Sequence, residues 1–157
     1  MLATMCRVIA GVVATVLIVL VSGLWGQAQT LEIDALRPRA VQGDAWAQYD
    51  PGQIFADGRG VPQDYEEALW WWRLAAEQGL TMAMTDIGLM YSLGRGVLQD
   101  DIQAYMWWDL AVLRFPMATG EREAAVTGRD SVAQRLSPAQ VAEAQRLASE
   151  WDAAHPR

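Results

Sequence analysis

The chain has 157 residues, of which 52% are hydrophobic, and its formal net charge at pH 7 is −7. An acidic surface repels phosphate backbones, so the composition argues against nucleic acid as a partner. The single cysteine, Cys6, lies close to the N-terminus, so we expect neither a disulfide nor a thiolate metal site in the rest of the chain.

The first element is an apolar segment. Arg7 is followed by VIAGVVATVLIVLVSGLW and then by GQAQT. A positive start, an apolar run and small residues before a cleavage point are typical of a secretory signal peptide. An uncleaved membrane anchor is the alternative, since about 18 apolar residues can just cross a bilayer. We therefore expect residues 1–28 to direct export. The remainder would then be periplasmic or secreted, or anchored to the inner membrane.

The middle of the chain repeats itself. GRGVPQDYEEALWWWRLA, which starts at Gly58, returns 36 positions later as GRGVLQDDIQAYMWWDLA at Gly94. We divide this part into a half-repeat at 29–43, a first repeat at 44–79 and a second repeat at 80–115. A fixed period of this length is typical of arrays whose units bury apolar faces against their neighbours. The pattern predicts an all-α fold, a short α-solenoid of stacked helix–turn–helix units.

The first helix of each repeat ends at a glycine loop. AMTDIGLMYSLG, which ends at Gly94, has apolar residues at steps of three and four, as a helix does. Gly88 interrupts this helix, which favours close approach of another helix. Gly94 and its counterpart Gly58 suit the left-handed residue that ends such a helix. Pro51 breaks the pattern in the first repeat. It predicts either a kink, which we favour, or a fresh helix capped by Asp50.

The second helix of each repeat begins with an aspartate. Asp64 with Glu67, and Asp100 with Gln103, have capping-box spacing. The aromatic residues that follow are expected in the helix interfaces, where they bury large areas. They are Trp71, Trp72, Trp107 and Trp108.

Residues 116–157 are predicted to form C-terminal capping helices. Pro116 ends the second repeat, and GEREAAVTGRDSVAQRL reads as a helix that packs on it. A last helix begins at Ser137, with Pro138 in its first turn and Gln140 at the capping-box position. Alanine at the contact positions and polar residues outside fit a terminal cap for a short stack.

The repeats resemble a known family. The stretch AQYDPGQIFADGRGVPQDYEEALWWWRLAAEQG is similar to a Sel1-like repeat, a relative of the tetratricopeptide repeat, and so is the second copy. With the half-repeat, the resemblance covers about residues 36–112. It implies an α-solenoid that binds other proteins, often as an adaptor in envelope, signalling or quality-control assemblies.

The sequence gives little sign of catalysis. The one histidine, His155, lies near a chain end that we expect to fray. Asp100 and Asp101 are explained better by helix capping than by metal binding. We therefore predict no catalytic residue, no metal and no cofactor.

Two surfaces are predicted to bind a partner. At positions where the family usually has polar residues, this chain has large apolar ones, which suggests an exposed patch: Trp46, Trp70, Met82 and Met106. Contact of these residues with the half-repeat or the C-terminal helices is the alternative. The second surface, by analogy with tetratricopeptide grooves, is the inner face of the first helices, with Gln48, Tyr49, Gln53, Thr85 and Leu89.

Three functions are compatible with these features. The first is a non-enzymatic adaptor of the bacterial cell envelope that binds another protein through the solenoid surface. The second is a cell-wall glycan-binding protein or weak hydrolase that uses exposed tryptophans, with Asp57 and Glu67 as the carboxylates to consider. The third is self-association into a homo-oligomer through the ends of the short stack.

Overall fold

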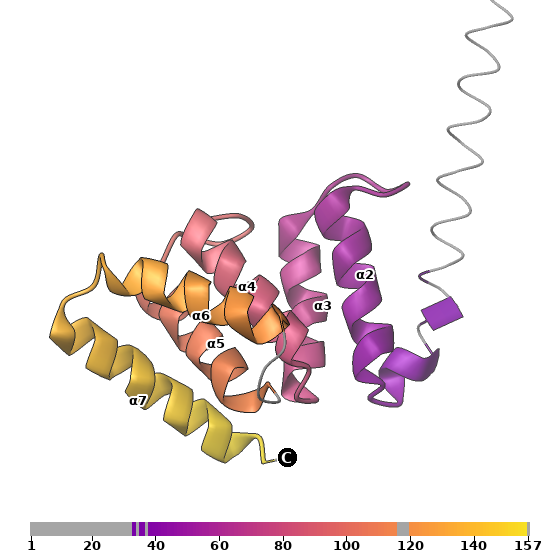
Figure 1. Ribbon diagram of the computed structural model, residues 1–157. Coiled ribbons are helices and arrows are strands. Elements are labelled where there is room, and N and C mark those ends of the chain that lie inside the picture. Colours follow the sequence, from indigo (N-terminus) through magenta and orange to yellow (C-terminus); the bar gives the residue numbers. More distant parts are fainter. Residues whose placement is uncertain (1–32, 34, 37, 116–119, 157) are drawn as a thin grey trace, which may run out of the picture.

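The computed structural model describes residues 33, 35–36, 38–115 and 120–156 (Figure 1). The predicted signal segment at 1–28 lies outside these residues, and so do Pro116 and the first residues of the half-repeat. Over the described part of the chain, no helix is both long and apolar enough to cross a membrane.

Helices make up the described structure, and no strand occurs in it. Residues 38–41 are helical. After them come α2 (Ala45–Asp57), α3 (Tyr65–Glu77), α4 (Thr81–Leu93), α5 (Asp101–Arg114), α6 (Gly120–Ala133) and α7 (Pro138–Ala154). The helices α2 and α3 pack as one pair, α4 and α5 pack as the next, and α3 joins the pairs by packing on α4 (Figure 1). The predicted all-α solenoid of stacked helical pairs is confirmed.

The predicted helix ends are present in both repeats. Gly58 and Gly94 have φ of 66° and 64°, the left-handed conformation that glycine adopts without strain. The Asp64 side chain accepts hydrogen bonds from the backbone N–H groups of residues 66 and 67. Asp100 does the same for residues 102 and 103. These carboxylates satisfy donors that a helix start leaves free.

Pro51 does not split the first repeat helix. The helix α2 runs without interruption from Ala45 to Asp57 with Pro51 inside it, and the proline ring is buried. Its N-cap is Asp44, which accepts from the N–H groups of Trp46 and Ala47. A fresh helix capped by Asp50 is therefore wrong, because the side chain of Asp44 already caps the whole of α2.

A glycine in the first helix of each repeat receives a tryptophan from the second. A Cβ atom added to Gly88 would lie 2.9 Å from the Trp108 ring, and one added to Gly52 would lie 2.4 Å from Nε1 of Trp72. Contacts this short leave no room for a side chain. The close helix approach predicted at Gly88 is confirmed, and it recurs at the matching position of the first repeat.

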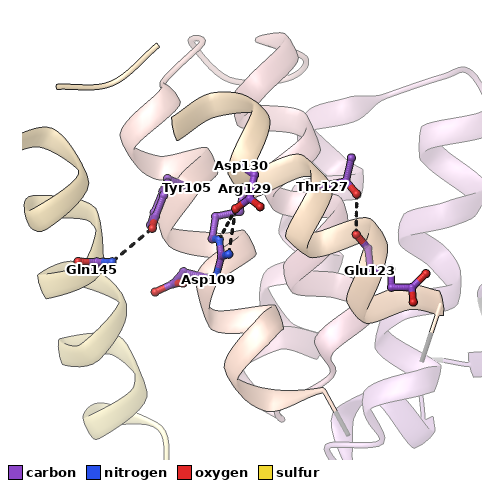
Figure 2. A network of polar contacts seen from close by, with 7 residues as sticks. All are labelled: Tyr105, Asp109, Glu123, Thr127, Arg129, Asp130 and Gln145. Atoms are coloured by element: carbon purple, nitrogen blue, oxygen red, sulfur yellow. Dashed lines mark hydrogen bonds and ion pairs between the residues drawn. The ribbon is translucent and has the colours of Figure 1, made fainter. Parts of the chain in front are cut away.

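The C-terminal helices α6 and α7 both pack on α5. Gly128 of α6 lies against the other side of Trp108, where an added Cβ would be 2.6 Å from the ring. Figure 2 shows the polar contacts at this junction: Arg129 of α6 donates to Asp109 of α5 (3.2 Å) and to its neighbour Asp130. Gln145 of α7 donates to the Tyr105 hydroxyl of α5 (3.3 Å).

The last turn of α7 is held on α5 by Arg114. This arginine donates to Asp152 (2.7 Å) and to the carbonyl of His155 (2.5 Å), and its guanidinium lies 5.0 Å from the centre of the Trp151 ring. The His155 ring stacks on Trp151 at 4.0 Å. The chain end that we expected to fray is therefore packed, because α7 crosses α5 where Arg114 ends that helix.

Candidate functional site

Three polar side chains meet between the two repeats: Tyr49 and Gln53 of α2 and Asp86 of α4. The Tyr49 hydroxyl on α2 donates to Asp86 Oδ2 on α4 (2.7 Å). Gln53, one turn after Tyr49, donates to the same oxygen (2.8 Å) and to the Tyr49 hydroxyl (2.6 Å). The group joins the first helices of both repeats. The sequence predicts Tyr49 and Gln53 at a partner-binding surface, but it does not predict Asp86 there.

Burial controls the electrostatics of this group. Desolvation raises the pKa of Asp86 to about 6, although the hydrogen bonds from Tyr49 and Gln53 act in the opposite direction. The pKa of Tyr49 is also raised, by burial first and then by the neighbouring Asp86. Tyr49 therefore stays a neutral donor at every physiological pH, and Asp86 titrates close to neutrality. These hydrogen bonds form a polar link between the two repeats.

The inner face offers little room for a peptide. A hollow of about 110 Å³ lies beside Asp86, and residues on both sides of it line the space: Tyr49, Met82, Thr85, Phe115, Glu121 and Ala124. Glu121 and Ala124 belong to α6, which therefore covers part of the predicted groove. Gln48 and Tyr49 are buried, Gln53, Met82 and Thr85 are half-buried, and Leu89 is exposed. Of the predicted inner-face residues, Leu89 is thus the most accessible.

The larger cleft lies on the other side of the first repeat. It has a volume of about 470 Å³ and opens between residues 40–41 and one side of α3. We call it the α3 cleft, and its lining residues are Ala40, Val41, Gln48, Glu67, Trp70, Trp71 and Leu74. Trp70 is 52% exposed and meets Trp71 edge-on, with ring centres 4.8 Å apart. Hollows that are lined by aromatic and aliphatic side chains are typical of binding surfaces.

Gln48 lines the α3 cleft, and a hydrogen bond holds its amide in place. Its Nε2 donates to the carbonyl of Ala40 (2.8 Å), which fixes the orientation of the amide. The residue is 6% exposed, and its Oε1 has no hydrogen-bond partner in the described structure. A buried polar atom without a partner is costly, and because this oxygen is shielded from solvent it is not a contact point for a ligand in the cleft. Glu67 is the charged residue of the lining, and it accepts from Trp71 Nε1 (3.2 Å).

The predicted apolar patch divides between the repeats. Trp46 is half exposed and packs edge-on against Tyr49, whereas Trp70 lines the α3 cleft. Met82 is half-buried. Met106 is 6% exposed, so its expected exposure is wrong. The reason is that α7 packs on α5, which is the contact with C-terminal helices that we held as the alternative.

The residues considered for hydrolysis have separate partners. Asp57 forms an ion pair with Arg59 (3.2 Å), and Glu67 accepts from Trp71. Across the described residues, no group of three or more histidine, cysteine, aspartate or glutamate side chains is placed to hold a metal ion. The geometry therefore gives no support to the hydrolase alternative.

Comparisons with known proteins identify the repeats. Residues 47–80 and 81–113 each match the Sel1 repeat. Among solved structures, c5321, described as a protective antigen of uropathogenic Escherichia coli strains displaying an SLR fold, is similar with a TM-score of 0.69. The identity is 29% over 78% of this chain, which spans 25% of the c5321 chain. A Sel1 repeat protein from Oxalobacter formigenes has 27% identity over 76% of this chain and 98% of its own, with a TM-score of 0.49. Among curated proteins, none matches the chain.

Proposed function

The chain carries two Sel1 repeats and so belongs among the Sel1-repeat proteins, which are generally protein–protein interaction modules, and on that premise we propose that it is a non-enzymatic adaptor of the bacterial cell envelope. It binds another protein through its first repeat. The observation that carries the proposal is the α3 cleft, which is lined by the half-exposed Trp70 and by apolar side chains.

The cleft has the composition of an interaction hot spot. Trp70 offers a large apolar surface at low cost in conformational entropy, and tryptophan is enriched among residues that dominate binding energy. Leu74 and Ala40 provide apolar walls, and the Glu67 carboxylate provides an acceptor that fixes the orientation of a ligand. Two repeats offer a small surface, so the adaptor contact is of modest affinity.

The envelope location rests on residues 1–28. Their positive start and apolar run are the reason to expect export. Attachment to the inner membrane follows if this segment is retained, and a periplasmic or secreted adaptor follows if it is removed. Fractionation of cells that express the full chain with a C-terminal tag distinguishes these outcomes from retention in the cytoplasm, which would contradict the envelope role.

Crosslinking in cells tests the adaptor role. A photo-crosslinking amino acid replaces Trp70 in the full chain, and a second strain carries it at Leu98, which is 91% exposed and lies outside the cleft. We expect one polypeptide to crosslink at position 70 and to be absent at position 98. Products that are the same at both positions, or retention on purified peptidoglycan with no polypeptide at position 70, would contradict the proposal.

A further inference from the structure

The chain itself shows what the surface around Trp70 accepts. The cleft side of α3 presents Glu67, Trp70, Trp71 and Leu74, and Gln78 follows one turn after Leu74 as the C-cap of the helix; we call these five residues the α3 stripe. A shift of 36 residues converts them into Gln103, Met106, Trp107, Leu110 and Arg114 of α5, the α5 stripe. Three of the five positions are therefore large and apolar in both repeats, and the two stripes share one geometry.

The α5 stripe is covered by a helix. Trp151 of α7 meets Trp107 edge-on, with ring centres 5.5 Å apart, and Arg114 bonds to Asp152. Met106 of the α5 stripe is 6% exposed, whereas its counterpart Trp70 is 52% exposed. In Figure 1, α7 lies on the far side of α5 from the first repeat, and on the α3 stripe Ala40 and Leu36 pack with Trp71 and Leu74 instead. Trp71 and Trp107 are equally buried, at 7% exposure each, so the two stripes differ at Trp70, which stays half exposed.

Charge separates the two stripes. The α5 stripe has Arg114, which forms an ion pair with Asp152 of α7. The α3 stripe has Gln78 at that position, and it has Glu67 where the α5 stripe has Gln103. Glu77 stands beside it where the second repeat has Leu113. The one arginine of α3, Arg73, donates instead to Tyr91 of α4. The surface around the α3 cleft is therefore more negative than the surface that binds α7.

We propose that the α3 cleft binds a basic amphipathic helix of the partner protein. The inference rests on the proposed adaptor function and specifies the chemistry of the partner. An aromatic or aliphatic face of that helix covers Trp70 and Leu74, as Trp151 covers Trp107. Lysine or arginine side chains lie near Glu67.

Two matched peptides test the proposal against the full chain. The first copies residues 137–156, the α7 segment, with blocked ends. The second is the same peptide with Glu143→Lys and Asp152→Lys, which reverses the sign of its net charge. Each carries a fluorescent label, and binding is followed by anisotropy at low and at high salt. We expect the basic peptide to bind at least about tenfold more tightly than the acidic one, with the difference reduced by salt.

Variants of the chain locate the binding. Trp70→Ala is expected to weaken the basic peptide about tenfold, and Glu67→Gln to reduce the preference for the basic peptide. Val41→Lys repels the basic peptide and leaves every tryptophan in place, because Val41 is 88% exposed. It therefore tests the cleft even if Trp70→Ala alters the fold. Leu98→Ala is the control and should leave both affinities unchanged.

Several results would overturn the inference. They are equal or tighter binding of the acidic peptide, no binding of either peptide, and affinities that neither Trp70→Ala nor Val41→Lys changes. A crosslink from position 70 to residues 1–32 of the same chain would also overturn it, since the occupant would then be this chain. A single polypeptide captured at position 70 without peptide binding would leave the adaptor function standing and remove the basic helix.

Discussion

Replacement of Asp86 by asparagine should change how the stability of the protein depends on pH. The asparagine Oδ1 can still accept from Tyr49 and Gln53, so Asp86→Asn removes the ionisation and keeps the shape of the link between repeats. Burial raises the pKa of Asp86 from an ordinary value of 3.8 to about 6, which means that the folded protein holds this proton more tightly than the unfolded chain.

The sign and the size follow from this difference. The folded state binds more protons, so the contribution of Asp86 to stability is greatest below pH 3.8 and is lost as pH rises through about 6. The interval between the two values corresponds to about 3 kcal/mol, since one pKa unit is worth about 1.4 kcal/mol. Relative to the wild type, Asp86→Asn should therefore gain up to about 3 kcal/mol of stability between pH 4 and pH 8.

Urea unfolding, followed by tryptophan fluorescence at several pH values, measures this quantity. The free energy of unfolding of the variant minus that of the wild type removes the contributions of other carboxylates. Asp101 is one of these, since its hydrogen bond with Arg135 lowers its pKa and its stabilising contribution falls in acid. We expect the difference to rise mainly between about pH 4 and 6 and then to level off. A difference that is constant across this range would refute a raised pKa at Asp86.

Four further substitutions, one of them a control, test the packing of the C-terminal helices. Gly128→Ala inserts a Cβ against the Trp108 ring and should lower the melting temperature in circular dichroism by several degrees, since overpacking costs about 1–3 kcal/mol. Gly120→Ala, with no atom within 4 Å of the added Cβ, should not lower it. Arg114→Met removes the bonds that hold the end of α7 and should cost about 2 kcal/mol, with faster amide exchange in α7 by mass spectrometry; unchanged exchange would contradict this. Ser137→Ala should cost about 1 kcal/mol in urea unfolding, because it removes the N-cap of α7; an unchanged unfolding midpoint would count against the cap.

Local features of the fold could be predicted from the sequence. The caps at Asp64, Asp100 and Ser137 and the left-handed glycines depend on neighbouring residues alone, and the structure has them where the patterns indicate. The repeat could also be recognised from the sequence, because an offset of 36 residues aligns both helices and the loop between them. The close approach of another helix at Gly88 was also predicted, and the structure shows that Trp108 makes it.

Features that depend on how distant elements cross were not predicted. The link from Tyr49 to Asp86 requires the relative position of α2 and α4, and nothing in the second repeat marks Asp86 as the partner of Tyr49. The burial of Met106 depends on the path of α7, which the repeat pattern does not specify. The α3 cleft was found only in part, since Trp70 was expected while Val41 and Leu74 were not. Its walls come from two segments whose approach is a property of the packed stack.

The C-terminal helices also limit how copies of the chain can join. A head-to-tail contact, in which the end of one stack continues into the start of the next, joins two different surfaces and produces an open filament. Here α6 presents exposed polar and charged side chains at that end, Glu121, Glu123, Thr127, Asp130 and Ser131. These side chains would lose their water on stacking without gaining partners. The exposed polar side chains of α6 therefore disfavour continuation of the stack by a second copy at this face.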